Sequence, residues 1–440
     1  MSLVQDSPSP CRRRPADGRT PEPGGRRLPP YLPFVAALTL ATCLQWLGSS
    51  AVLPLLPLYL RRQGTSDAMV GAVMAAFFAA GVVAQYLGGR LGDRIGHRPV
   101  LLIGLVGYAV ASAGFLLPLA GPGYAVLRAG QGAAAGAAQV AMLALVTGAV
   151  PAAVRGRAIS AVFGGELAGV AIGPLLGSLL GVSRMATLFL VASGAALLAG
   201  LPVLVIRRRP GSGGSASATA DPVAADPAVA GTPPAGTSAR VRLPRTGPAG
   251  RALVGVMLSA VASGVLTGVY EACWTLLLDY RHAQPWQIGA SWTLFALPFV
   301  LGAPIAGWVA DHYDRRLLVV VGLLVSVGFA LAYPWIGDVT WLIGLGAAES
   351  LGVAFAVPAA QSLLGQAAPA DRIGQAQGLF ASIQTAAIAG TALVSGALFA
   401  VAAWWPFTLA AVVALALTGL LPWVWRGTSG WIGHPDGRAG

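Results

Sequence analysis

Four charged side chains lie inside long apolar stretches of the sequence. Arg128 is the basic one, and the acids are Glu166, Glu271 and Glu349. A charge at the centre of a bilayer costs roughly 2.5–3.5 kcal/mol on insertion scales, so such groups face a protein interior and usually serve a function. A carboxyl group in a low-dielectric interior can bind and release a proton near neutral pH, and its carboxylate attracts cations. These four residues are candidates for proton coupling. The alternatives are acids that only pack helices and an arginine bonded to backbone carbonyls.

A short charged stretch, residues 89–99 (GRLGDRIGHRP), lies between two apolar runs. Each run is long enough to cross a bilayer, which takes roughly 20 residues. The stretch places Asp93 beside Arg94 and Arg98 at one membrane face. A carboxylate there can accept hydrogen bonds from a facing helix N-terminus and from arginine. The alternative is a solvated surface pair worth about 0–1 kcal/mol.

A looser copy of this stretch spans residues 307–317 (GWVADHYDRRL), with Asp311 and Arg315 in the corresponding places. The two copies lie about half a chain apart, which indicates a duplicated membrane protein. Asp314 stands where a glycine would repeat the first copy, so the second copy is the weaker of the two.

Polar and aromatic residues within the apolar stretches are candidates for substrate contacts. Aromatic faces suit lipophilic cations. The alternative for any single ring is a place in the aromatic belt at the membrane interface. The candidates are Gln45, Trp46, Gln131, Tyr270, Trp274 and Trp292.

The composition indicates an integral membrane protein. The chain has 440 residues, of which 56% are hydrophobic and only 10% are charged, whereas soluble domains carry about 25% charged residues. The net charge of +12 comes from arginines in loops and tails, which argues for membrane orientation and against nucleic-acid binding. The three cysteines and four histidines do not cluster. We therefore expect no disulfide framework, no metal and no cofactor.

Twelve apolar spans alternate with short polar loops, which predicts an all-α integral membrane protein. A Gly/Ser/Ala/Pro-rich segment, residues 207–250, divides the spans six and six and is typical of a flexible linker. The predicted organisation is a disordered tail at 1–30, a six-helix half at 31–206, the linker at 207–250, a second six-helix half at 251–426 and a tail at 427–440. The spans lie near 34–60, 68–88, 99–119, 122–149, 157–181, 185–206, 251–278, 286–310, 316–336, 339–367, 373–398 and 402–425.

The arginines predict the orientation. If the termini, the linker and the alternate loops share one side, that side holds 23 of the 28 arginines and the other side holds four. The positive-inside rule then places both termini in the cytoplasm of a multi-pass protein of the cell membrane.

Several motifs of this chain resemble the major facilitator superfamily, and more narrowly its twelve-span drug:proton antiporters. The 89–101 stretch is similar to the family's first cytoplasmic motif, G-x-L-a-D-r-x-G-r-k-x-x-l. The first span is similar to the pattern l-g-x5-P-x-x-P, the fourth to R-x-x-q-G and the fifth to g-x-x-x-G-P-x-x-G-G. The matching residues are Gly89, Leu91, Asp93, Arg94, Gly96 and Leu101; Leu47, Gly48, Pro54 and Pro57; Arg128, Gln131 and Gly132; and Gly169, Gly173, Pro174 and Gly177, with Ser178 in place of the last glycine.

The resemblance implies two pseudo-symmetric six-helix halves that act as a monomer. It implies a conformational latch of Gly89, Asp93, Arg94, Gly96 and Arg98, with Asp311 and Arg315 as the weaker partner. It implies a helix kink at Gly169, Gly173, Pro174 and Gly177. The first, fourth, seventh and tenth helices line the cavity of this family, which points to Glu271 and Glu349 as cavity acids. Apart from the resemblance, Glu166 lies three residues before Gly169, which makes it a candidate partner for Arg128.

The leading hypothesis is a proton-driven exporter of lipophilic small molecules that works by alternating access in the lipid bilayer. The nearest alternative is an uptake symporter or facilitator for a sugar or an organic acid. A non-transporting polytopic sensor is disfavoured, because four intramembrane charges would be costly to keep without a use. An enzyme is disfavoured because the spans contain no histidine, and their serines lack an evident base.

Overall fold

A computed structural model describes residues 29, 31–151, 154–205, 247–368 and 373–428. Helices make up almost all of this part of the chain, and no strand occurs in it. Ten helical segments within it are long and apolar enough to cross a membrane, counting the broken first helix as one. Adding the 18-residue α4 and the 28-residue α9 gives twelve long segments, so the predicted all-α fold with twelve spans is confirmed.

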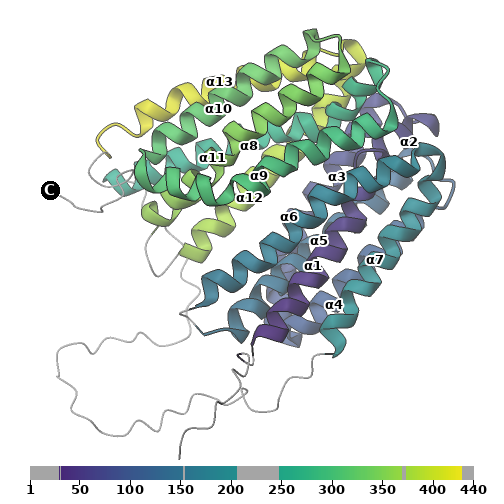
Figure 1. Ribbon diagram of the computed structural model, residues 1–440, viewed down its shortest axis with the longest axis horizontal. Helices are drawn as coiled ribbons and strands as arrows, with labels where there is room; N and C mark the ends of the chain where they lie inside the picture. The colour runs from purple at the N-terminus through teal and green to yellow at the C-terminus, as the bar shows by residue number, and fades with distance from the viewer. Residues whose placement is uncertain (1–28, 30, 152–153, 206–246, 369–372, 429–440) are drawn as a thin grey trace, which may run out of the picture.

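The helices fall into two sequential groups on either side of the linker (Figure 1). The N-terminal half contains α1 (Leu32–Val52), α2 (Leu56–Arg62), α3 (Asp67–Ile95), α4 (His97–Gly114), α5 (Gly121–Ala149), α6 (Arg155–Leu180), the 3-10 turn η2 (Val182–Arg184) and α7 (Met185–Val205). The C-terminal half contains α8 (Gly247–Tyr280), α9 (Pro285–His312), α10 (Arg315–Ala332), the 3-10 turn η3 (Tyr333–Trp335), α11 (Val339–Ala367), α12 (Ile373–Val401) and α13 (Trp405–Val424).

Two boundaries differ from the sequence prediction. The first span is broken into α1 and α2, because Pro54 has no N–H to donate and its ring opposes the carbonyl one turn back. The seventh span begins earlier than expected, since α8 starts at Gly247, inside the predicted 207–250 linker. Pro248 then occupies the first turn of the helix, where a missing N–H costs nothing. The predicted 1–30 tail, most of that linker and most of the 427–440 tail lie outside the described residues.

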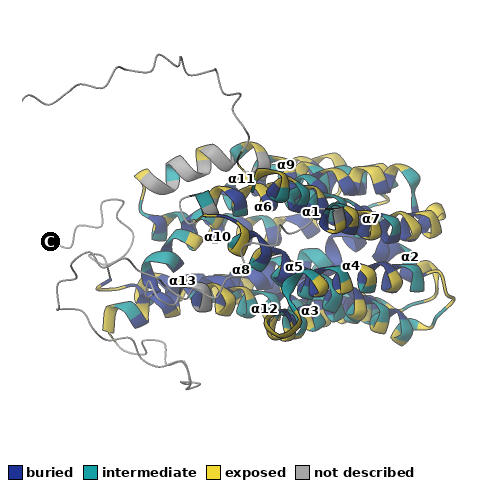
Figure 2. Ribbon diagram, turned by 90° about the horizontal axis from the view of Figure 1, so that it is seen from below, coloured by how far each residue is buried: buried dark blue, intermediate teal, exposed yellow. Residues whose placement is uncertain are grey.

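Small residues allow neighbouring helices to approach until backbones touch. A Cβ atom on Gly136 of α5 would lie 2.6 Å from the Gly81 carbonyl oxygen of α3, and one on Gly104 of α4 would lie 2.8 Å from the Ala134 carbonyl oxygen of α5. In lipid the hydrophobic effect does not drive helices together, so such close approach is what holds the bundle. Figure 2 shows the result: buried residues line the inner helix faces and exposed residues the outer ones. The outer faces carry large apolar side chains, as expected of a surface in contact with lipid.

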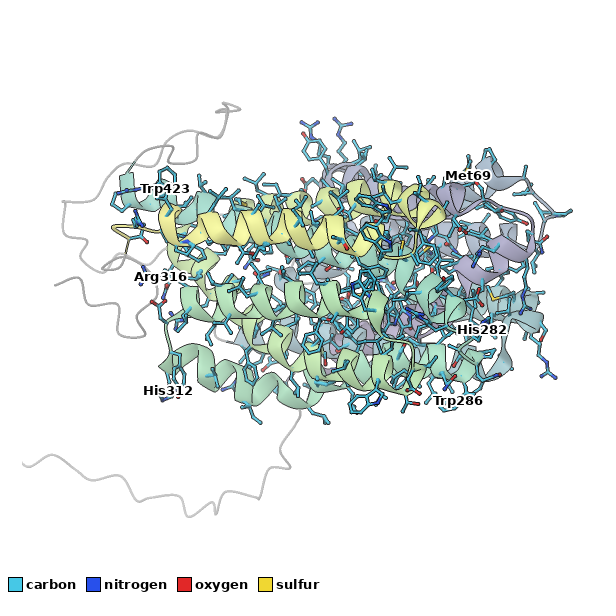
Figure 3. The ribbon with its side chains drawn as sticks, turned by 90° about the horizontal axis from the view of Figure 1, so that it is seen from above. Met69, His282, Trp286, His312, Arg316 and Trp423 are labelled. Carbon is cyan, nitrogen blue, oxygen red and sulfur yellow. The ribbon has the colours of Figure 1, made fainter. Side chains whose placement is uncertain are left out.

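The two halves meet at one end of the molecule and diverge toward the other (Figure 1). We call the first the α2 end; Met69, His282 and Trp286 lie there in Figure 3. The second is the linker end, where Arg316 and His312 lie. At the α2 end Arg61 of α2 pairs with Asp279 of α8 at 3.1 Å. The described contacts between the halves therefore close the α2 end.

Candidate functional site

Two adjoining cavities lie within the C-terminal half. The larger measures about 270 Å³ and lies among α8, α9, α10, α11 and α12. The smaller measures about 120 Å³ and lies among α8, α9, η3 and α11. Four residues line both of them, namely Thr267, Tyr270, Phe295 and Glu349. The shared lining places Glu349 at the junction of the two spaces.

Glu349 is buried and held by tyrosine hydroxyls. Its side chain projects from α11 and only 1% of the residue is exposed. Tyr270 of α8 donates to Oε1 at 3.0 Å, and Tyr333 of η3 donates to Oε2 at 2.6 Å. Ser326 of α10 lies beside the same carboxyl group. Both carboxylate oxygens therefore have donors, which stabilises a charge that would otherwise be costly to bury.

Aromatic rings form the wall around this carboxyl group. Trp274 packs edge-on against Tyr333 at 4.9 Å between ring centroids, and against Tyr270 at 6.2 Å. The Trp274 indole N–H donates to Ser291 Oγ at 3.0 Å, which fixes the ring. The indole nitrogen of Trp292 also lies at the smaller cavity and has no hydrogen-bond partner among the described residues. A ligand with an acceptor group can satisfy this donor.

Glu271 faces the other half of the protein. It lines the smaller cavity from α8, and its charge interacts with that of Arg128 on α5. Its Oε2 and the Arg128 Nε both lack hydrogen-bond partners in the described residues. No described contact joins Glu166 to Arg128, and their approach stays a prediction.

Arg128 is held by a polar network within the N-terminal half. Its guanidinium donates to Gln131 Oε1 at 2.9 Å, and the Gln131 amide donates to Ser112 Oγ of α4 at 2.8 Å. The guanidinium also lies 4.3 Å from the ring centroid of Phe77 on α3, a cation–π contact that suits a buried arginine. Gln131, expected at the substrate, therefore positions Arg128 in this conformation.

The glycine motif of α6 packs directly on α1. Cβ atoms on Gly169 and Gly173 would lie 2.7 Å and 2.6 Å from the carbonyl oxygens of Cys43 and Leu47. One on Gly177 would meet the Ala51 carbonyl. The motif glycines thus recur every four residues and follow one ridge of α1. The Ser50 hydroxyl of α1 donates to the Gly169 carbonyl at 2.9 Å, and Pro174 lies inside α6 without ending the helix.

The residues predicted to form a latch in the 89–99 stretch lie at the linker end. Gly96 joins α3 to α4 with φ 93°, a conformation that L-residues avoid. The Asp93 side chain is 77% exposed and lies 3.6 Å from His97. Arg98 donates to the Val203 and Leu204 carbonyls at the end of α7, where the helix dipole favours a positive charge. Arg98 therefore binds within its own half.

The remaining predicted residues are placed as follows. Gln45 is buried and Trp46 half-buried on α1, and neither lines the two cavities described above. Gly89 lies near Val140 of α5, and Arg94 is exposed. Arg315 is buried at the start of α10. The side chain of Asp311 lies outside the described residues.

Residues 38–270 and 252–430 match the family model of the Major Facilitator Superfamily, which covers most of the chain. The chain belongs to the Major Facilitator Superfamily. This is a family of transporters rather than enzymes, which agrees with the prediction that the chain is not an enzyme.

Curated relatives match parts of the chain. YqjV of Bacillus subtilis, described as an uncharacterized MFS-type transporter, is 28% identical over 160 residues, 36% of this chain and 39% of the relative. The quinolone resistance protein NorA of Staphylococcus aureus is 33% identical over 66 residues, 15% of this chain and 17% of NorA. The chain therefore spans less than half the length of these relatives.

Solved transporters share the fold over nearly their whole length. A POT family transporter in complex with a thioalcohol-conjugated peptide superposes with a TM-score of 0.72 at 14% identity, covering 89% of this chain and 96% of that one. A D-xylose-proton symporter superposes with a TM-score of 0.70 at 15% identity, covering 92% and 99%. At these identities the likeness concerns the fold alone.

The sequence argument missed several residues of this candidate site. The main omission is Tyr333, which donates to Glu349 from a short turn. Ser291, Ser326 and Thr267 also line the cavities. Hydroxyl residues are common in helices and carry no periodic signal, so the sequence offers little to separate these from others. Tyr333 lies just beyond the last turn of α10, as the first residue of η3.

Proposed function

We propose that this chain is a proton-coupled transporter that exports lipophilic small molecules across the cytoplasmic membrane by alternating access. The observation that supports this most is the pair of acids at the smaller cavity, Glu271 and Glu349, surrounded by aromatic rings. A carboxylate attracts a proton or a cationic group, and the rings supply an apolar surface for the rest of a lipophilic molecule. One site can then bind proton and substrate alternately.

In this proposal the two carboxyl groups have different tasks. Glu349 binds the proton or the cationic part of a substrate within the C-terminal half. Glu271 interacts with Arg128 across the halves, so its charge influences how the halves sit together. Glu166 lines neither cavity and has the weakest claim to proton coupling.

The orientation and the conformation follow from the same proposal. The arginine distribution supports a linker end in the cytoplasm, and with that orientation the structure is closed on the outside. Asp93 is exposed in it, as expected of a latch that engages only when the cytoplasmic side closes. Asp311 and Arg315 would form the second part of that latch, and Gly173-Pro174 would adapt α6 to the movement. The transporter would act as a monomer.

Export is favoured over uptake by the antiporter-like motif of α6 and by the partial likeness to the quinolone resistance protein NorA. The second candidate is an uptake symporter, which the structural likeness to a D-xylose-proton symporter favours. The residues lining the cavities include two acids and no basic residue, which argues against an organic acid as substrate.

Purified protein in liposomes that contain a pH-sensitive dye tests the proposal. A panel of cationic and neutral drugs is added under an imposed proton gradient. We expect drug-dependent proton flux in the wild type, its loss in Glu349→Gln and Glu271→Gln, and its retention in the matched control Glu166→Gln. Absence of flux with any drug, together with counterflow of a sugar, would overturn the export proposal in favour of uptake.

A further inference from the structure

The 3-10 turn η3 links the cavity to the α2 end of the molecule. Its first residue, Tyr333, is 1% exposed and donates its hydroxyl to Glu349. Its second residue, Pro334, accepts a hydrogen bond on its carbonyl from the guanidinium of Arg281. Its third residue, Trp335, stacks on Trp404 at the start of α13, with 6.2 Å between ring centroids. A turn of three residues is thus fixed at three points.

Arg281 continues this path to the boundary between the halves. It directly follows α8, and Asp279 in the last turn of that helix pairs with Arg61 of the N-terminal half at 3.1 Å. Arg61 also pairs with Asp67 at the start of α3 at 3.0 Å. Hydrogen bonds therefore lead from the buried carboxyl group of Glu349 through η3 to Arg281, and the backbone joins Arg281 to Asp279 of the ion pair between the halves.

We propose that Tyr333 is a positioning residue that transmits the occupancy of Glu349 to the α2 end. The inference rests on the proposed function, in which Glu349 binds the proton or the cationic substrate. With neither bound, the carboxylate accepts the Tyr333 hydroxyl and keeps η3, Arg281 and the ion pair in the closed arrangement. A proton on Oε2 makes that oxygen a donor, and a bound cation competes for its charge, so either one weakens the bond from Tyr333.

Coupled exchange of proton and substrate requires that only a loaded transporter can open, and this arrangement meets that requirement. The empty transporter stays closed at the α2 end, while a transporter carrying a proton or a substrate can open there. Movement of the empty form would allow substrate to pass without a proton. Tyr333 would therefore enforce coupling rather than take part in binding.

Other groups facing Glu349 have to be separated from Tyr333. From α8 come Tyr270 and Glu271, and from α10 comes Ser326. The cavity-lining residues of α9 and α12 do not titrate; they are Ser291, Trp292, Phe295, Phe380 and Gln384. Tyr270 is the matched control, because its hydroxyl binds the same carboxylate but it belongs to α8. Its ring packs edge-on against Tyr333 with 6.1 Å between ring centroids, and Tyr270→Phe keeps that ring while removing the hydroxyl.

The test measures the separation of the halves at the α2 end by double electron–electron resonance in lipid nanodiscs. Spin labels replace Arg62 of α2 and Trp286 of α9, which are exposed and lie on opposite halves. In every spin-labelled protein the native cysteines are replaced by alanine, so that only the two chosen positions carry labels. Distances are recorded without substrate at pH 5 and pH 9, first in the otherwise unchanged protein and then in each variant.

Without further substitution, we expect the open population to rise about fivefold or more from pH 9 to pH 5, the size that loss of one hydrogen bond supports. In Tyr333→Phe the open population should be high at both pH values, whereas Tyr270→Phe and Glu271→Gln should keep the pH response. Arg281→Gln breaks the path at its other end without touching the cavity and should behave like Tyr333→Phe.

A pH response that survives in both Tyr333→Phe and Arg281→Gln would overturn the inference, as would its absence in the parent protein. These distances need neither substrate nor flux, so they separate this inference from the proposed function. Flux that depends on drug, with no change in distance, would retain export and refute the role of Tyr333. A normal distance response without any drug-dependent flux would support the role of Tyr333 and refute export of the drugs tested.

Discussion

The packing of α6 on α1 leads to a prediction with a matched control on the same helix. A Cβ atom on Gly169 would lie 2.7 Å from the Cys43 carbonyl oxygen, 2.7 Å from the Leu47 nitrogen and 2.9 Å from the Trp46 Cβ. A Cβ atom on Gly164 would meet nothing within 4 Å. Two of the obstructing atoms belong to the α1 backbone, so Gly169→Ala can be accommodated only if the helices separate.

The magnitude follows from two terms. Both substitutions gain the helix propensity of alanine over glycine, about 0.5–1 kcal/mol. Only Gly169→Ala incurs overpacking, which costs about 1–3 kcal/mol. The shared term cancels in the comparison, so Gly169→Ala should be less stable than Gly164→Ala by about 1–3 kcal/mol. This corresponds to a factor of about 5 to 150 in the unfolding equilibrium, since 1.4 kcal/mol is tenfold.

The assay is reversible unfolding by steric trapping in bicelles, with thermal unfolding in mild detergent as a second measure. Gly164→Ala should match or exceed the wild type, while Gly169→Ala should fall below its control. If the two variants unfold with the same free energy, then α1 and α6 do not touch at Gly169, and the account of the motif as a packing ridge is wrong.

Two further predictions concern movement and closure. Gly173→Leu should abolish drug resistance in cells without loss of expression, because α6 cannot move past α1 with a bulky side chain between them. Gly194→Leu is the control, because a Cβ atom there would be unobstructed. Unchanged resistance in Gly173→Leu would count against the motif's role. Asp279→Asn should raise the open population at the α2 end by at most about fivefold, since its pair with Arg61 is partly exposed and worth about 0–1 kcal/mol. High salt should remove this difference, and a difference that persists at 1 M salt would show that screening does not act on the pair.

The helical architecture could be predicted from the sequence, because a lipid bilayer restricts which segments can span it. A span needs roughly 20 apolar residues whose backbone is satisfied within a helix, and this pattern survives any arrangement of the helices. The break between α1 and α2 follows from Pro54 in the same way. The start of α8 was missed, since a Gly-Pro-Ala-Gly stretch is equally typical of a linker and of the first turn of a helix.

The site was less predictable, because it depends on which helix faces meet. The acids were identified from their cost in lipid, and two of them do line the cavities. Their partners were not identified: Arg128 interacts with Glu271 of the other half, and Glu349 is held by a tyrosine from a three-residue turn. Pairings of this kind join residues 79 to 143 positions apart or lie in short turns, where neither periodicity nor span counting applies.

Closure at the α2 end relies mainly on backbone contact and only weakly on charge. A Cβ atom on Gly71 of α3 would lie 2.7 Å from the Ala392 carbonyl oxygen of α12, and one on Gly289 of α9 would meet Pro174 and Ser178 of α6. Contacts between small residues can separate without leaving a polar group unpaired, because the backbone groups involved stay bonded within their own helices. Opening therefore requires little desolvation. Under these conditions a single hydrogen bond from Tyr333, about 0.5–1.5 kcal/mol, is large enough to change the open population several-fold, so one buried carboxyl group can control the movement of two six-helix halves.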